Sequence, residues 1–100
     1  MKACLDHINK AFESRVRLGI MSALMVNDTL DFTSLKQLLG LTDGNLASHA
    51  RALEEAGYIA CAKQFVGRRP NTTYSATPAG REAFRRHLDA LEEFIRQQRQ

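Results

Sequence analysis

Residues 33–57 read TSLKQLLGLTDGNLASHARALEEAG and contain two helix starts and two helix stops. Threonine is a good N-cap because its side-chain oxygen accepts a hydrogen bond from a free N–H group of the first turn, and both Thr33 and Thr42 precede leucines at helical spacing. Glycine commonly ends a helix in the left-handed conformation, and Gly40 and Gly57 stand where the two leucine patterns stop. The stretch therefore predicts two short helices joined by a tight turn.

The second of these helices, which we expect to run from Thr42 to about Ala56, has two different sides. Its inner stripe is apolar and consists of Leu46, Ala50 and Leu53. On the other side, Asn, Ser and His stand three and four residues apart and project together. An Asn side chain can form two hydrogen bonds with adenine, and an Arg side chain can bind guanine or phosphate. The side chains of Ser and His can each donate or accept a hydrogen bond. The candidate contact residues here are Thr42, Asp43, Asn45, Ser48, His49 and Arg51.

The sequence pattern changes after Gly57. Residues 58–66 and 72–76 are rich in strand formers, and they flank a turn cluster of Gly, Arg, Pro and Asn. They predict a β-hairpin with a basic tip over about residues 58–76. We expect at least one tip arginine to contact an anion, whereas Lys63 on the stem can equally be an edge-strand charge that discourages aggregation. The candidate contact residues of the hairpin are Lys63, Arg68, Arg69, Asn71 and Thr72.

The flanking segments complete the expected fold. Apolar residues at steps of three and four predict a long helix from about residue 5 to 26, and residues 30–32 alternate as a very short strand. Thr77 followed by Pro78 is a strong helix start, so the last helix is expected over about residues 78–97. This helix is apolar on two sides, which favours a symmetric partner. The expected dimer interface comprises Leu5, Ile8, Phe12, Phe84, Leu88, Leu91, Phe94 and Ile95.

Three arginines open the last helix, namely Arg81, Arg85 and Arg86. Cations near a helix N-terminus oppose the helix dipole, so an anionic partner or an acidic patch on another subunit is the expected use for them. Glu82 can pair with Arg86 within the helix, which is the plainer account of that arginine.

Composition and charge narrow the class of protein. A chain of 100 residues is expected to form one domain over residues 1–100. Residues 63–86 carry six Lys or Arg against a single acid, which indicates a polyanionic partner, most often nucleic acid, with a solvated surface as the alternative. No apolar stretch is long enough to span a bilayer, so we expect no membrane contact. Two cysteines are too few for a disulfide scaffold, which fits the cytoplasm.

The order of elements is helix, short strand, helix, turn, helix, hairpin, helix. This is the pattern of a winged helix-turn-helix: mainly α with a small β-hairpin, and here with long first and last helices at a dimer interface. A helix fits the major groove of DNA, and the hairpin can bring arginine to phosphates or into the minor groove.

Over about residues 5–95 the chain resembles small winged-helix transcriptional regulators of the MarR and ArsR types. The resemblance is carried by residues 38–49, 53–59, 65–74 and 77–81. It implies a homodimer that binds a palindromic operator in double-stranded DNA, with the start of the second helix of the motif in the major groove. It further implies that Arg68 and Arg69 face the backbone or the minor groove of adjacent DNA.

The same residues bear on other functions. There is no Gly-rich phosphate loop, no Ser/His/Asp arrangement and no metal-ligand set, so we expect neither an enzyme nor a cofactor. Cys4 and His7 could bind a metal only across a dimer, and His87 and Asp89 do not share a helix face as a metal sensor would require. A protein-interaction adaptor, and a sensor with a small effector ligand between the first and last helices of the dimer, stay open as alternatives.

Overall fold

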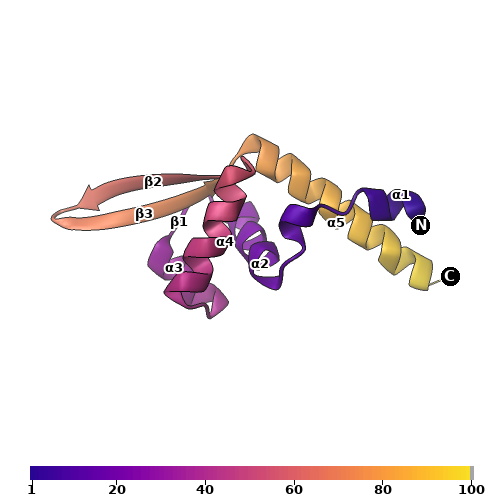
Figure 1. Ribbon diagram of the computed structural model, residues 1–100, viewed down its shortest axis with the longest axis horizontal. Helices are drawn as coiled ribbons and strands as arrows, with labels where there is room; N and C mark the ends of the chain where they lie inside the picture. Colours follow the sequence, from indigo (N-terminus) through magenta and orange to yellow (C-terminus); the bar gives the residue numbers. More distant parts are fainter. Residues whose placement is uncertain (100) are drawn as a thin grey trace.

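The computed structural model describes residues 1–99, which fold into helices around a small antiparallel sheet (Figure 1). In chain order the elements are α1 (Lys2–Asp6), η1 (Lys10–Phe12), α2 (Arg15–Val26), β1 (Leu30–Asp31), α3 (Phe32–Leu39), α4 (Asp43–Glu55), β2 (Ile59–Val66), β3 (Arg69–Ala76) and α5 (Pro78–Gln98). The strand order is β1-β3-β2. The molecule measures 57 × 25 × 21 Å, because the β2–β3 hairpin extends from one end of the body and α5, with α1 beside it, from the other.

Local capping signals set most of the element boundaries as expected. The Thr42 hydroxyl accepts a hydrogen bond from the backbone N–H of Asn45 at 3.1 Å and so begins α4. Gly40 follows α3 with a φ of 64°, in the left-handed region that glycine adopts without steric cost. Thr77 caps α5, and Pro78 stands at its first helical position.

The start of α3 differs from the sequence expectation. Asp31 caps this helix, and Thr33 lies inside it. The Asp31 carboxylate accepts a hydrogen bond from the backbone N–H of Ser34 at 2.7 Å, which lowers the pKa of Asp31. Aspartate and threonine are both good N-caps, and here the strand β1 holds Asp31 in the extended conformation that an N-cap needs.

The long first helix expected over residues 5–26 is wrong. The segment forms three pieces, α1, η1 and α2, because two polar residues between them adopt extended backbone and cap the next element. The Asn9 side chain accepts a hydrogen bond from the N–H of Ala11 at 2.9 Å, and the Ser14 hydroxyl accepts one from the N–H of Arg17 at 3.4 Å. Side chains of this kind compete with helix continuation, so the apolar periodicity runs across elements that are not one helix.

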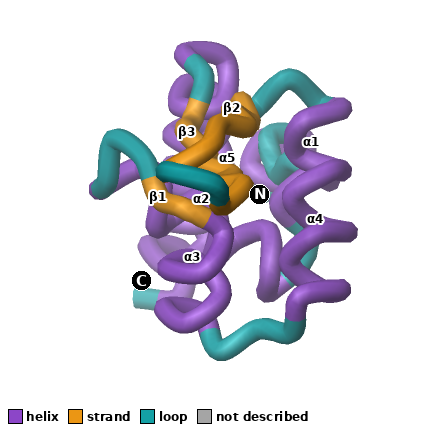
Figure 2. The backbone as a smooth tube through the Cα atoms, turned by 90° about the vertical axis from the view of Figure 1, so that its left-hand side faces the viewer, coloured by secondary structure: helices purple, strands orange, loops and turns teal. Residues whose placement is uncertain are grey.

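The core lies between α2, α4, the sheet and the first half of α5. Ile20, Met21 and Leu24 of α2 are fully buried, and the inner stripe of α4 packs against them. Figure 2, which looks from the hairpin side, shows α4 along one side of the sheet. The rings of Phe12 and Phe84 meet edge to face with their centroids 5.1 Å apart, so both belong to this core.

Asn9 ties the N-terminal segment to the body through two hydrogen bonds. Its backbone N–H donates to Nδ1 of His87 at 3.1 Å, and its side-chain amide donates to the hydroxyl of Tyr58 at 3.0 Å. The imidazole of His87 is buried beside the ring of Phe12, with the two centroids 5.3 Å apart. Because Nδ1 is an acceptor here, this hydrogen bond requires the neutral imidazole.

Stability is expected to fall as the pH drops below about 6.5, because burial lowers the pKa of His87 while Glu13 acts weakly in the opposite direction. His87 then binds a proton more readily in the unfolded chain than in the folded one. The contribution of neutral His87 to the free energy of unfolding is therefore complete above the ordinary histidine pKa and is lost as the pH falls below it. Melting temperatures at about pH 5.5 and about pH 7.5 measure this effect. In the variant His87→Gln the amide oxygen can still accept the hydrogen bond from Asn9 but does not titrate. Its melting temperatures at the two pH values should therefore differ by less than those of the wild type. An equal difference in both proteins would contradict this role of His87.

Candidate nucleic-acid interface

The outer face of α4 is a short row of exposed polar side chains. Asn45, Ser48 and Arg51 are all exposed, while Leu46, Ala50 and Leu53 on the opposite side are buried as expected. The packed side holds the helix in place, and the exposed side carries amide, hydroxyl and guanidinium groups that can reach base edges or phosphates.

His49 is held by a residue that the sequence reasoning missed. Its Nδ1 accepts a hydrogen bond from Nε of Arg17 at 3.1 Å, and the ring is half-buried. Arg17 lies in the first turn of α2, where a cation opposes the helix dipole, but the helix expected over residues 5–26 placed Arg17 in a helix interior and so hid this signal. The contact sets the tautomer with the proton on Nε2 and brings a second guanidinium to the side of α4.

The acidic residue at the start of α4 is paired within the chain. Nζ of Lys36, near the end of α3, lies 2.8 Å from a carboxylate oxygen of Asp43. An exposed ion pair of this kind adds little stability. Its effect on the site is electrostatic, because it offsets the one negative charge in the first turn of the helix.

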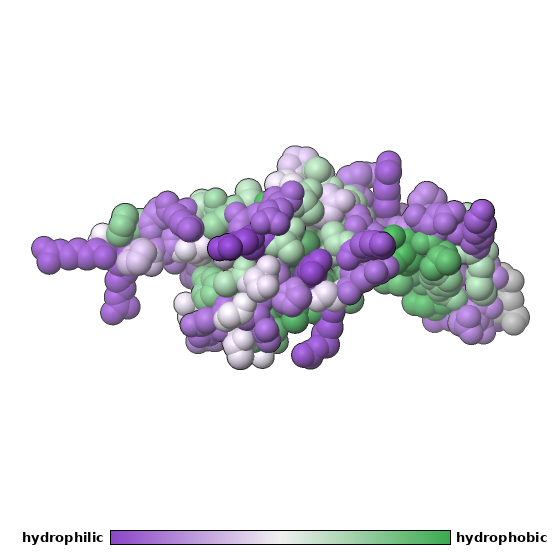
Figure 3. Space-filling view, in the orientation of Figure 1, coloured by the Kyte–Doolittle hydropathy of each residue, from purple (hydrophilic) through white to green (hydrophobic). Residues whose placement is uncertain are grey.

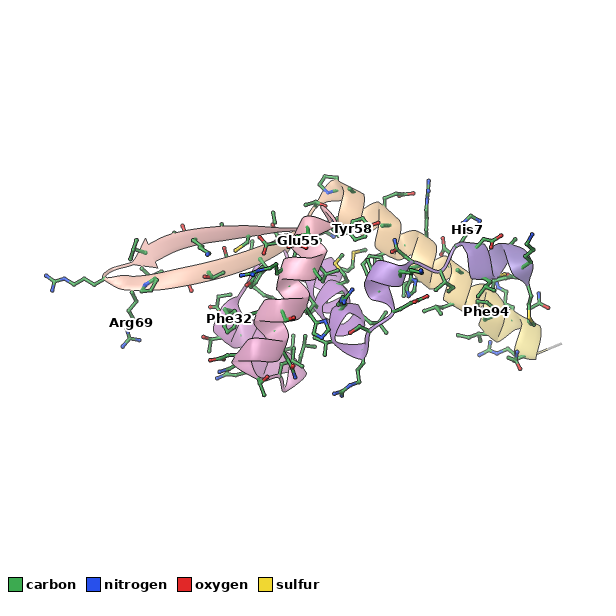
Figure 4. All side chains as sticks on the ribbon, in the orientation of Figure 1. His7, Phe32, Glu55, Tyr58, Arg69 and Phe94 are labelled. Carbon is green, nitrogen blue, oxygen red and sulfur yellow. The ribbon has the colours of Figure 1, made fainter. Side chains whose placement is uncertain are left out.

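The hairpin, which we call the wing (residues 59–76), ends in a two-residue turn. Val66 pairs with Arg69, so the turn consists of Gly67 and Arg68, and Gly67 has a φ of 67°. A glycine at the first position of a two-residue loop suits the right-handed twist of a hairpin. The turn leaves the side chains of Arg68 and Arg69 exposed, and Figure 4 shows Arg69 projecting sideways from the wing near its tip.

The pleat of the wing divides the candidate residues between two faces. Lys63 pairs with Thr72, and both lie on the face that continues to the buried Tyr74. Arg69 and Asn71 alternate with these positions along β3 and lie on the opposite face. The sequence prediction placed residues 67–71 in the turn, which is wrong for residues 69–71, because they pair with β2 and begin β3. For that reason the sequence identified basic and polar residues of the wing without dividing them between two faces.

A groove of about 680 Å³ separates α4 from the wing. Its lining includes Arg51 and Lys63, and it also includes Glu54 and Glu55. Figure 4 shows Glu55 at the end of α4 nearest the wing. The carboxylates thus lie at the C-terminal end of α4, away from the exposed amide and hydroxyl groups of its first turns. Polyanion binding is favoured at the start of α4 and at the wing tip, while in the groove between them the two carboxylates offset the charges of Arg51 and Lys63.

Comparison with known proteins identifies this architecture. Residues 16–95 match the family described as winged helix DNA-binding domain. The chain belongs to this family. An uncharacterised protein of Methanocaldococcus jannaschii is 38% identical over 79 residues, which cover 79% of this chain and 86% of the relative.

Solved structures agree with the assignment. The structure of a transcriptional regulator homologue from Pyrococcus horikoshii is 33% identical, with a TM-score of 0.85 over 95% of each chain. The transcriptional regulator Tm0710 from Thermotoga maritima shares the fold at 17% identity, with a TM-score of 0.69 over 96% of this chain and 72% of that one. The protein is therefore a winged-helix protein of the transcriptional-regulator type, and the family is one of DNA-binding proteins rather than enzymes.

The arginines at the start of α5 have partners within this winged-helix chain. Both terminal nitrogens of the Arg81 guanidinium donate at 3.4 Å, one to the carbonyl oxygen of Leu24 and one to that of Met25, at the end of α2. Arg86 donates to Glu82 at 3.2 Å, and Arg85 lies 3.9 Å from the same carboxylate. The prediction that Arg81 binds an external anion is therefore wrong. Its guanidinium group instead binds the free carbonyl groups at the C-terminus of α2, where a positive charge is favourable.

The residues expected at a dimer interface fall into two groups. Phe12 and Phe84 are each 2% exposed in the core of this chain, so they have almost no surface left for a partner and are removed from the predicted interface. Leu5, Leu88 and Ile95 are exposed on α1 and α5, and Ile8, Leu91 and Phe94 are half-buried. Figure 3 shows hydrophobic surface over α5 at the end opposite the wing, where Figure 4 places Phe94.

A second, smaller concavity of about 340 Å³ lies between α1 and α5, and Cys4 and His7 are on its wall. Within residues 1–99, no group of three or more His, Cys, Asp or Glu side chains is arranged to hold a metal ion.

The other cysteine, Cys61, has a raised pKa because of burial and the nearby Glu54 carboxylate, so its thiol stays protonated at neutral pH. No helix in the described part of the chain combines the length and apolar character of a membrane span.

Proposed function

We propose that this winged-helix protein is a transcriptional regulator that binds specific sequences of double-stranded DNA as a homodimer. The observation that carries the proposal is the pairing of an exposed polar face on α4 with a basic wing tip that projects from the same body. The resemblance to a transcriptional regulator homologue over nearly the full length of both chains supports it.

In this proposal α4 enters the major groove and the wing lies over the adjacent backbone or minor groove. Asn45, Ser48 and Arg51 read or flank base edges, and Arg17 orients His49 beside them. The wing supplies phosphate contacts, which dominate affinity and make it depend on salt. The full set of proposed contact residues is Thr42, Asp43, Asn45, Ser48, His49, Arg51, Lys63, Arg68, Arg69, Asn71 and Thr72.

We further propose that the exposed apolar residues of α1 and α5 form a two-fold interface. Leu5 is 64% exposed and Ile95 is 51% exposed, which is unfavourable for large apolar side chains unless a partner covers them. A two-fold dimer presents two copies of α4 to half-sites about one helical turn apart, so the operator should be palindromic. In this proposal residues 1–100 act as one domain in the cytoplasm, where they meet the chromosome.

The role of α4 predicts a loss of specificity without a loss of general affinity. Asn45→Ala with Ser48→Ala should weaken binding to a duplex selected from a randomised pool by about tenfold or more, because contacts to base edges are lost. Binding to unrelated duplexes should stay unchanged, since phosphate contacts remain. Competition titrations with Gln98→Ala, an exposed side chain at the far end of α5, as the control measure both affinities. An equal loss on all sequences, or no loss on the selected one, would count against the major-groove role.

The interface predicts a change in mass. Leu88→Asp with Leu91→Asp should convert the dimer into a monomer of 11.2 kDa in light scattering, because two charges would be placed in an apolar contact. Val26→Asp with Leu38→Asp adds the same charges at exposed positions on α2 and α3 and should leave the mass unchanged. A dimer that persists in the first variant would contradict this interface.

A further inference from the structure

The wing tip carries large apolar side chains as well as arginines. Phe65 is 74% exposed and Val66 is 65% exposed, although both are the last residues of β2 and stand next to the turn. Figure 3 shows hydrophobic atoms among the hydrophilic ones near the end of the wing. Exposed aromatic and β-branched residues on a protruding hairpin invite aggregation, so their presence calls for a use.

The register gives Phe65 a defined neighbour and a defined face. It pairs with Pro70 across the hairpin, and both share the face that carries Lys63 and Thr72 beside the groove. Val66 pairs with Arg69 on the opposite face. Phe65 and Pro70 therefore form an apolar pair on the side of the wing that continues toward α4.

Positive charge surrounds this apolar pair. Lys63 lies two residues away on the same face, Arg68 stands in the adjoining turn, and none of the ion pairs found within residues 1–99 involves either of them. An apolar ring flanked by unpaired cationic side chains is complementary to one kind of surface in particular, namely a base step bordered by phosphates. Proteins that bend DNA from the minor groove insert Phe or Pro between bases in this way.

We propose that Phe65, supported by Pro70, enters the minor groove as a wedge that partly unstacks a base step and bends the DNA toward the major groove of that step. Lys63 and Arg68 hold the phosphates on either side of the step while the ring enters. Pyrimidine–purine steps unstack most easily, so the wedge also favours such a step under the wing. The inference rests on the proposed function, because it requires the wing to lie on DNA.

The test uses the full chain and a duplex chosen by selection from a randomised pool, labelled with a dye at each end and with 2-aminopurine at pyrimidine–purine steps. Wild-type protein should raise 2-aminopurine fluorescence at one step in each half-site and increase energy transfer between the ends. Phe65→Ala should abolish both signals and weaken binding roughly tenfold, the loss expected for a stacked aromatic side chain. Phe65→Leu should keep part of both signals, since leucine is also a wedge residue.

Val66→Ala is the matched control, because it removes an exposed apolar side chain from the opposite face and should leave both signals unchanged. Both variants should melt at the wild-type temperature, since neither side chain is buried. Binding by wild type without unstacking, or equal signals in Phe65→Ala and wild type, would overturn the wedge and leave the proposed function standing. Failure of the wild-type protein to bind any duplex at low salt would overturn both. Loss of self-association in Phe65→Ala with unchanged DNA signals would assign the ring to a protein contact instead and so overturn the wedge.

Discussion

Replacing Arg68 and Arg69 together with alanine is expected to weaken binding to every duplex by roughly 60-fold at about 0.1 M salt. Both side chains are exposed at the tip of the wing, where they are free to meet phosphates. Each phosphate contact adds about 0.9 to the slope of log K against log salt, so the slope should fall by nearly two. Fluorescence anisotropy titrations over a range of salt concentrations measure both quantities.

Arg85→Ala with Arg86→Ala is the charge-matched control. It removes the same two positive charges, but these arginines stand on α5 beside Glu82 rather than on the wing. The control should lower affinity only slightly and leave the slope unchanged. Equal losses in the two double variants would mean that net charge, and not the wing, attracts the DNA.

Gly80→Ala is expected to destabilise the fold by about 3 kcal/mol or more, at the upper end for overpacking. A methyl group on Gly80 would overlap the carbonyl oxygen of Tyr58 and lie within 2.7 Å of its carbonyl carbon. That oxygen already accepts the backbone N–H of Thr77 at 3.0 Å, so the backbone on both sides of the contact is fixed. Thermal unfolding should show a drop of about 10–25 °C.

Gly44→Ala provides the comparison at a glycine with open space around it. No atom outside its immediate neighbourhood lies within 4 Å of a methyl group built there, and the residue is inside α4. Alanine is the better helix former by about 1 kcal/mol, so this variant should be as stable as wild type or slightly more so. If Gly80→Ala had the same melting temperature as Gly44→Ala, α5 would not pack against Tyr58 as described.

Signals that act over a few residues were the ones that could be read from the sequence. Thr42, Gly40 and the Thr77–Pro78 pair each satisfy backbone groups of an adjacent helix end, so their positions predicted the boundaries of α3, α4 and α5. The start of α3 was misplaced because two capping residue types, Asp31 and Thr33, stand two positions apart. Here the strand before the helix decided between them.

Periodicity failed at the N-terminus for a physical reason. Leu5, Ile8 and Phe12 have helical spacing, but Asn9 and Ser14 can cap a helix wherever they stand, and here they interrupt it. The spacing of apolar residues also cannot distinguish a side chain that is buried within its own chain from one that stays exposed and can contact a second subunit. Phe84 and Leu88 follow the same seam, yet Phe84 is 2% exposed and Leu88 is 43% exposed.

Contacts between residues far apart in the chain could not be predicted from the sequence. Arg17 and His49 are 32 positions apart, and Arg81 is 56 from the carbonyl group of Met25 that it binds. Only the packing of α2 against α4 and α5 brings these groups together. The sequence could name candidate side chains on α4 and the wing, but it could not show that Arg17 supports His49 or that the wing residues form two faces.

The most direct test of sequence-specific DNA binding is a titration of the purified protein against fluorescent genomic fragments at two salt concentrations, with the region upstream of its own gene among them. A sequence-specific regulator should form a salt-sensitive complex on one or a few fragments, and this complex should survive an excess of unrelated competitor DNA. Equal, salt-sensitive binding to all fragments would contradict a specific regulator, and no binding even at low salt would contradict DNA binding altogether.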